Sequence, residues 1–192
     1  MKKITVFLIL ALFTLMVPAQ DGQGMQDDGM KAWMEFMTPG SQHQMLAKGV
    51  GEWTVTNTYW FTQGAEPVTS EGTAVGSMLM GGRYLQTVQK GNVMGMPFEG
   101  MSVEAYDNGL GKFVSTWIDN MGTGIGFAEG TIDPASGKIV YEGTMTDPMT
   151  KMGTWFKQTF EIVDENTHKI EMFMKGEDGI EFKNMEVTMT RK

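Results

Sequence analysis

The sequence contains no cysteine, which excludes disulfides and a cysteine-linked lipid anchor and leaves a packed core as the source of stability. Histidine is scarce as well, with only His43 and His168 in 192 residues, so histidine-based catalysis has little to work with. The motifs Gly-x-Ser-x-Gly and His-Glu-x-x-His, a phosphate-binding loop and a dinucleotide-binding glycine motif are also missing. The sequence therefore contains no recognisable catalytic motif and indicates no cofactor.

The apolar run near the start of the chain is too short to span a bilayer. It extends from Ile4 to Val17, follows Lys2 and Lys3, and ends in Val17-Pro18-Ala19. A membrane-spanning helix needs about 20 apolar residues, whereas a basic start, a shorter apolar run and small residues at its end are typical of a secretory signal peptide. Residues 1–19 are thus predicted to be a signal peptide that is cleaved after Ala19, without a membrane anchor afterwards. We expect the protein to be periplasmic or secreted.

Basic residues are outnumbered by acidic ones. Residues 1–19 hold two lysines and no acid, so the remaining chain carries 13 basic against 23 acidic residues, a net charge of −10. Such a surface repels nucleic acids and anionic lipids, and neither is an expected partner.

Methionine is abundant, with 18 residues beyond position 19. Exported methionine-rich segments can bind Cu(I) through thioethers. Here no histidine or cysteine lies beside pairs such as Met94 and Met96 or Met172 and Met174. Methionine also fills irregular cores, so we expect no metal site but an adaptable interior suited to apolar ligands.

The chain beyond residue 19 divides into three parts. Residues 20–29 are polar and rich in glycine and are expected to form a flexible leader. Residues 30–50 show helical spacing interrupted by Pro39-Gly40, which predicts two short helices. Residues 51–192 then change to a period of two and form a single domain of alternating strands.

About ten strands follow one another in this domain, separated by turn sequences such as Asp107-Asn108-Gly109 and Gly176-Glu177-Asp178-Gly179. No long helix interrupts them, so the fold class is all-β with antiparallel hairpins. The first strand begins at Gly51, and the others are expected over residues 71–79, 83–90, 98–106, 112–119, 123–132, 138–146, 154–163, 169–175 and 181–191. Closure into an up-and-down barrel removes two exposed edges and is favoured over a sandwich.

Two sets of residues resemble known proteins. Gly51-Glu52-Trp53, together with Arg191 near the end of the last strand, is similar to the pattern of calycins, the lipocalin-like barrels. A guanidinium over an indole makes a sound cation-π contact, and the resemblance implies that Trp53 and Arg191 join the first and last strands. Residues 51–192 resemble the bacterial domain of unknown function 1579 family; the matching segments are residues 81–85, 94–100, 106–108, 115–119 and 121–124. This second resemblance implies a calycin-like barrel and brings no established reaction.

Polar residues on apolar strand faces are the candidate ligand-binding residues. Alternation places Ser115, Trp117 and Asp119 on one face, where Asp119 would lie at the barrel mouth. Asp119 could instead cap the turn that follows it, and Trp117 could be packing. The other candidates on apolar faces are Asn57, Tyr59, Tyr141 and Gln158.

Both histidines have structural interpretations. His168 follows a turn and is expected to be a solvated loop residue, and His43 is expected to pack or make a hydrogen bond on the second helix.

Three functions are compatible with these patterns. The first is a binding module that holds a small apolar molecule in a barrel cavity of at least about 300 Å³. The second is an enzyme that uses Asp119 as an acid or base at the barrel mouth. The third is a structural or interaction protein with a filled barrel.

Overall fold

The computed structural model describes residues 22–192. The signal peptide expected over residues 1–19 lies outside the described residues, as does the start of the expected leader. The second of two compact units begins at Phe36 and contains every strand.

Two helices precede the strands. Helix α1 covers Gly22–Met37 and helix α2 covers Ser41–Ala47. Most of the leader expected over residues 20–29 is therefore helical; the apolar spacing used for the prediction begins only at Met30, and the preceding polar turns lack it. Within residues 22–192, neither helix is long and apolar enough to cross a bilayer.

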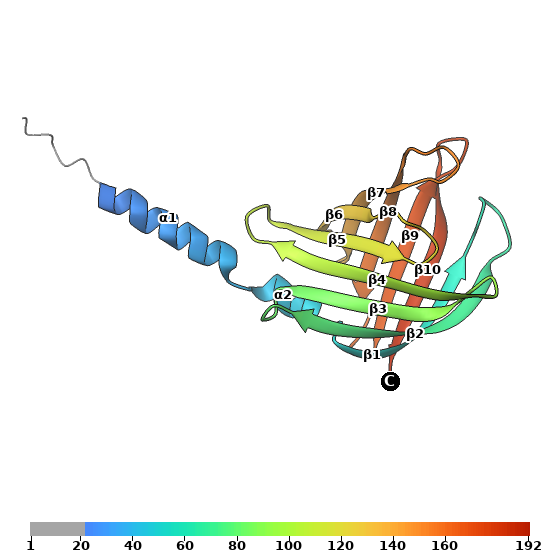
Figure 1. Cartoon of the computed structure of the whole chain (residues 1–192), viewed down its shortest axis with the longest axis horizontal. Coiled ribbons are helices and arrows are strands. Elements are labelled where there is room, and N and C mark those ends of the chain that lie inside the picture. The colour runs from blue at the N-terminus through green and yellow to red at the C-terminus, as the bar shows by residue number, and fades with distance from the viewer. Residues whose placement is uncertain (1–21) are drawn as a thin grey trace, which may run out of the picture. The chain divides into compact units, whose positions relative to one another are not determined.

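Ten antiparallel strands form a closed barrel in which each strand pairs with its neighbours in sequence and β1 pairs with β10 (Figure 1). This confirms the predicted up-and-down barrel. The strands are β1 (Gly51–Tyr59), β2 (Val68–Leu79), β3 (Tyr84–Val93), β4 (Met96–Asp107), β5 (Lys112–Asp119), β6 (Gly126–Ile132), β7 (Ile139–Thr146), β8 (Gly153–Ile162), β9 (Thr167–Lys175) and β10 (Glu181–Arg191).

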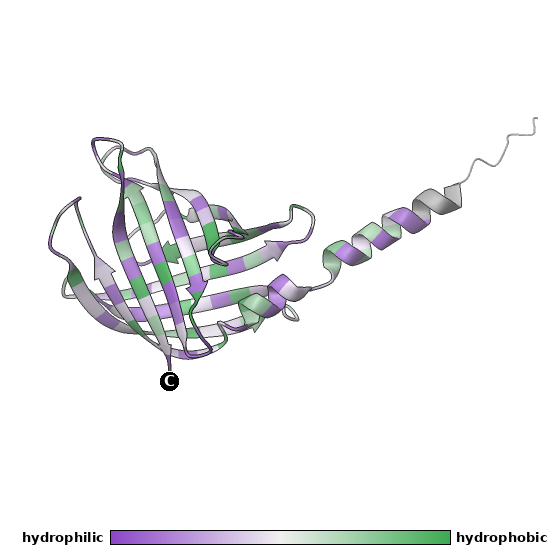
Figure 2. Ribbon diagram, turned by 180° about the vertical axis from the view of Figure 1, so that it is seen from behind, coloured by the Kyte–Doolittle hydropathy of each residue, from purple (hydrophilic) through white to green (hydrophobic). Residues whose placement is uncertain are grey.

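The period of two in the sequence separates an inner from an outer face. Hydrophobic and hydrophilic residues alternate along the strands (Figure 2). On β1, for example, Trp53, Val55 and Asn57 are buried while Thr54 is exposed. Alternating side chains point to opposite faces of a strand, so one set points into the barrel and the other meets solvent.

One end of the barrel is packed solid. Leu46 of α2 belongs with Leu85, Phe113 and Tyr141 to the larger of two core clusters. His43, also on α2, is buried with its ring 6.0 Å from that of Tyr106, and its Nδ1 accepts a 2.9 Å hydrogen bond from the Gly40 amide. The packing role expected for His43 is thus confirmed, and α2 covers this end.

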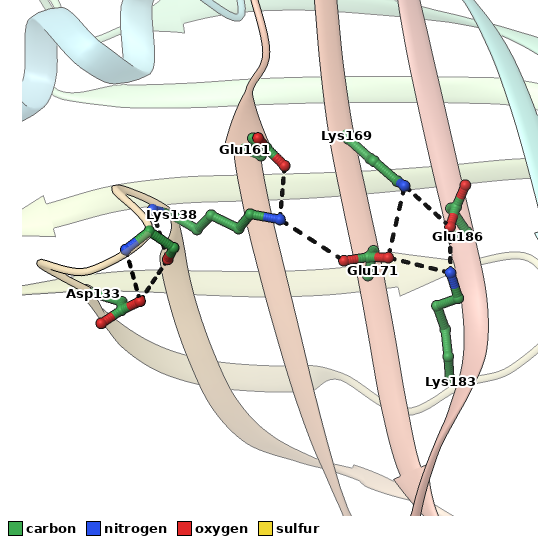
Figure 3. Close-up of polar contacts among 8 residues, drawn as sticks. Asp133, Lys138, Glu161, Lys169, Glu171, Lys183 and Glu186 are labelled. Atoms are coloured by element: carbon green, nitrogen blue, oxygen red, sulfur yellow. Dashed lines mark hydrogen bonds and ion pairs between the residues drawn. The ribbon is translucent and has the colours of Figure 1, made fainter.

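Charged residues on the outer face of the barrel form a connected network (Figure 3). Lys138 lies 2.7 Å from Glu161, Lys183 lies 3.2 Å from Glu171, and Lys169 lies 3.3 Å from Glu186. Glu171 also lies within 4.0 Å of Lys138 and within 3.7 Å of Lys169. Each acid of this network therefore has a lysine partner.

Candidate ligand-binding cavity

The barrel is hollow at the end opposite α2. A cavity of about 370 Å³ lies inside the barrel, lined by residues of β1 and of β3 to β10. The loop residues Gly122, Gly124 and Ile125 border it. Its volume falls in the range of small-molecule pockets, about 300–1,000 Å³.

Aromatic and sulfur-containing side chains form part of a mostly apolar cavity wall. The rings of Phe98 and Trp117 stack with centroids 6.3 Å apart, and Tyr59, Phe156 and three methionines also line the cavity. Gly100 makes room for this pair, because a Cβ there would lie 2.4 Å from the Trp117 ring. An apolar, partly flexible wall of this kind suits an apolar ligand.

Asn57 faces the cavity beside Gln89. It is 4% exposed, and its Oδ1 accepts a 3.0 Å hydrogen bond from Gln89 Nε2. The side-chain oxygen of Asn57 is therefore bonded to a neighbouring side chain rather than to backbone. Its position in the wall leaves the pair available to orient a ligand.

Asp119 lies at the mouth of the cavity, and its carboxylate accepts hydrogen bonds from two neighbouring residues. Its Oδ2 accepts a 2.7 Å hydrogen bond from Trp117 Nε1, and its Oδ1 accepts a 2.9 Å hydrogen bond from the Met121 amide. The carboxylate thus caps the turn after β5 and fixes the indole plane against the cavity. Both of the sequence interpretations of Asp119, cavity lining and turn cap, describe its position.

Glu104 is the functional candidate that sequence reasoning missed. It lines the cavity from β4, is 8% exposed, and makes no hydrogen bond or ion pair with any residue in the described part of the chain. Burial raises the pKa of its carboxyl to about 7. A signal was present, since alternation puts Glu104 on the same face as Phe98 and Tyr106, where an acid is unexpected.

Tyr141 lies deeper in the barrel than the other candidates. Its side chain is fully buried in the core cluster and does not line the cavity, and its hydroxyl has no hydrogen-bond partner in the described chain. Burial, and then the charge of Glu104, raise the pKa of this hydroxyl well above its usual value. The six other predicted residues meet at the one cavity: Asn57, Tyr59, Ser115, Trp117, Asp119 and Gln158.

The expectation for His168 was wrong. Strand β9 already begins at Thr167, which turns His168 inward, and the side chain is 1% exposed. Its ring lies 4.5 Å from that of Trp53 and 5.3 Å from that of Phe160. Burial, followed by the charge of Arg191, lowers the pKa of His168 to about 4. His168 is a neutral core residue at the packed end.

Arg191 and Trp53 meet at the same end of the barrel. The guanidinium lies 4.2 Å from the centre of the Trp53 ring, and the two residues are direct partners in the β1–β10 register. Among residues 22–192, no group of three or more histidine or acidic side chains is placed to hold a metal ion.

Comparisons with known proteins agree with the fold. The family described as "Protein of unknown function (DUF1579)" matches residues 38–191. No curated protein sequence matches the chain.

Several solved structures are similar in fold, among them the following two. Rv2717c from M. tuberculosis has a TM-score of 0.60 and 14% identity over 81% of this chain and 99% of its own. The S-type phycobiliprotein lyase CPES from Guillardia theta has a TM-score of 0.56 and 10% identity over 83% of this chain and 96% of its own. At these identities the likeness concerns the fold alone.

Proposed function

The chain belongs to the DUF1579 family of proteins of unknown function, and from this premise we propose that it binds a small, mostly apolar molecule inside its barrel. The observation that carries the proposal is the cavity of about 370 Å³. A barrel built only for structure would fill this space with side chains, because empty volume forfeits packing energy. The aromatic wall supplies apolar contact, and the Asn57–Gln89 pair supplies hydrogen-bonding groups for orientation.

The loops around the cavity mouth support an apolar ligand. Each of the five loops at this end carries at least one exposed apolar side chain: Phe61, Met94, Ile125, Met149 and Ile180. These side chains offer an incoming apolar molecule contacts before it reaches the wall. The similarity in fold to a protein named as a phycobiliprotein lyase is compatible with a barrel that binds another molecule.

We also propose that the protein acts outside the cytoplasm. The basic start and short apolar run of residues 1–19 support export with cleavage after Ala19. A chain without cysteine is compatible with oxidising and with reducing compartments, so its composition does not support one location over another. The proposal of export therefore depends on the N-terminal sequence alone.

The alternatives receive less support. An acid–base role for Asp119 competes with the hydrogen bonds that both of its oxygens already accept from Trp117 and Met121. A filled barrel disagrees with the cavity volume.

A matched pair of tryptophan substitutions tests the proposal. Ser115 lines the cavity, whereas Thr116 is its neighbour on the opposite face of β5. We expect the neutral probe N-phenyl-1-naphthylamine to fluoresce with saturable, one-site binding in the native protein and in Thr116→Trp. Ser115→Trp, which fills the cavity, should weaken binding at least about tenfold. Equal binding by the two folded variants, checked by circular dichroism, would place the probe outside the cavity and contradict the proposal.

Native mass spectrometry of the protein purified from its own envelope complements this test. A retained small molecule that disappears in Ser115→Trp would identify the natural ligand.

A further inference from the structure

The cavity contains acids and lacks bases. Among the described residues that line it, Glu104 and Asp119 are acidic and none is lysine, arginine or histidine. Lys138, Lys169 and Lys183 instead pair with acids on the outer face (Figure 3). The electrostatic potential inside the cavity is therefore set by carboxyl groups.

The two acids differ in how well they are satisfied. Asp119 accepts hydrogen bonds at both oxygens, whereas the carboxyl of Glu104 has no partner within residues 22–192. Glu104 is also more than nine-tenths buried, at 8% exposure. Buried carboxyl groups are nearly always paired, because an unpaired buried charge is costly.

Further polar groups surround Glu104. Ser102 lies two residues before it on the same face of β4, and Ser115 is its direct partner across the β4–β5 register. The Tyr141 hydroxyl, which has no partner in the described chain, interacts electrostatically with Glu104 from below the cavity. The deep end of the cavity is thus lined by polar groups, and aromatic side chains line the wall above them.

We propose that the ligand is an organic cation, with an apolar body held by the aromatic wall and a protonated nitrogen paired with Glu104. This inference rests on the proposed function and specifies its ligand class. An ammonium group donates up to three hydrogen bonds, which the Glu104 carboxylate and the Ser102 and Ser115 hydroxyls can accept.

The acidic residues of the cavity favour a cationic head group over an anionic or a neutral one. An anionic head group would add a negative charge beside Glu104 and Asp119, with no cation in the described wall to offset it. A neutral alcohol can bind, but it leaves Glu104 without a counter-charge. The faces of Phe98 and Trp117 add cation-π attraction for a positive ligand.

Binding of a cation is coupled to proton release from Glu104. Burial raises the pKa of Glu104 to about 7, so the empty cavity holds a carboxyl that is partly protonated near neutral pH. The other titratable groups facing the interior are Tyr59, Tyr106, Asp119, Tyr141, His168 and Arg191. Burial raises the pKa of Tyr59 and of Tyr141, and it lowers that of His168 to about 4. These three groups therefore stay uncharged between pH 6 and 8.

Three probes of one shape test the ligand class by isothermal titration calorimetry: 1-naphthylmethylamine, 1-naphthylmethanol and 1-naphthoate. We expect the amine to bind at least about tenfold more tightly than the alcohol, and the carboxylate to bind most weakly. Glu104→Gln should weaken amine binding about 10- to 100-fold and change alcohol binding less than about threefold. The control Glu99→Gln removes an exposed acid from the same strand and should leave all three affinities unchanged.

Proton release gives a second measurement that does not depend on a variant. Titrations in buffers of different ionisation enthalpy should show about 0.9 protons released per amine bound at pH 6 and about 0.1 at pH 8, as expected for a group with a pKa near 7. The alcohol should release none.

The outcomes separate this inference from the proposed function. Tight alcohol binding with no preference for the amine, or amine binding that is unchanged in Glu104→Gln, would contradict the proposal of a cationic ligand. The proposal that the barrel binds an apolar molecule would still stand. Preference for the carboxylate would contradict the proposal of a cationic ligand as well. Failure of N-phenyl-1-naphthylamine and of all three probes to bind would overturn both proposals.

Discussion

Arg191 joins the two ends of the barrel sheet by lying across Trp53, with 4.2 Å between the guanidinium carbon and the centre of the indole ring. The same guanidinium donates hydrogen bonds to the carbonyl oxygens of Val50, Lys48 and Glu165, at 2.7, 2.9 and 3.1 Å. Trp53 Nε1 in turn donates a 3.0 Å hydrogen bond to the Gly49 carbonyl. One side chain therefore connects β10 with the segment before β1 and with the turn before β9.

Replacing Arg191 by alanine should destabilise the protein. The change removes a cation-π contact and three charge-assisted hydrogen bonds, so we expect the free energy of unfolding to fall by about 2–4 kcal/mol. Arg191→Lys should recover only part of the loss, because an ammonium cannot present the planar fork that reaches three carbonyls. Urea denaturation measures both values.

The neighbouring Lys192 offers the control for this prediction. Its side chain is exposed at the chain end, and Lys192→Ala should change the unfolding free energy by less than about 0.5 kcal/mol. Equal stability of Arg191→Ala and Lys192→Ala would show that the guanidinium does not stabilise the closed barrel.

Asp119 should matter both for stability and for the shape of the cavity. Asp119→Ala removes the acceptors of the Trp117 indole and the Met121 amide, and we expect a loss of about 1–2 kcal/mol in unfolding free energy. The freed indole should also weaken binding of N-phenyl-1-naphthylamine. Urea denaturation and fluorescence titration measure the two effects.

Asp133 provides a matched control at the opposite end of the barrel. It caps the β6–β7 turn through the amides of Ala135 and Ser136, at 3.3 and 3.0 Å, and does not line the cavity. Asp133→Ala should lower stability to a similar degree and leave probe binding intact. If both variants reduce probe binding equally, the loss reflects general destabilisation rather than the orientation of Trp117.

The strands were predictable from local chemistry. Period-two alternation and Asp-, Asn- and Gly-rich turns gave β5 and β10 with the bounds that the structure shows. The same alternation identified Asn57 and Gln158 as polar residues on inner faces. These features depend on a few neighbouring residues, which is why one sequence suffices.

Features that depend on the whole barrel were not predictable. Glu104 shares a strand face with apolar residues, but its isolation results from the lack of a basic residue among the described residues that line the cavity. His168 was expected in a loop because the turn before it was assumed to extend two residues further than it does. The depth of Tyr141, below the cavity floor, follows from strand stagger, which turn chemistry does not reveal.

Glu104 should reduce the stability of the empty protein at neutral and alkaline pH. The folded-state pKa of about 7 lies above the unfolded value of 4.5. Between these values the unfolded chain loses a proton that the folded protein retains, so stability falls as pH rises from about 4.5 to about 7. Glu104→Gln should therefore raise the free energy of unfolding by about 3 kcal/mol at pH 8 and leave it nearly unchanged at pH 4. Urea denaturation across this range measures the difference.

An exposed acid serves as the reference for Glu104. Glu52 lies on the outer face of β1, and Glu52→Gln should change the free energy of unfolding at pH 8 by less than about 0.5 kcal/mol. A Glu104→Gln variant that is less stable than the native protein at pH 8 would indicate that the carboxylate has a partner in the folded state.

His168 should produce the opposite dependence on pH. Its pKa is about 4 in the folded protein and 6.5 when unfolded, mainly because of burial. As pH falls from about 6.5 to about 4, the unfolded chain gains a proton that the folded protein excludes, so stability is lost over this window. We expect His168 to account for about 3 kcal/mol of the loss. His168→Phe keeps an aromatic ring against Trp53 and Phe160 and removes the titration. Carboxylates titrate alike in both proteins, so the difference between their stability curves isolates the histidine; parallel curves from pH 4 to 7 would contradict the prediction.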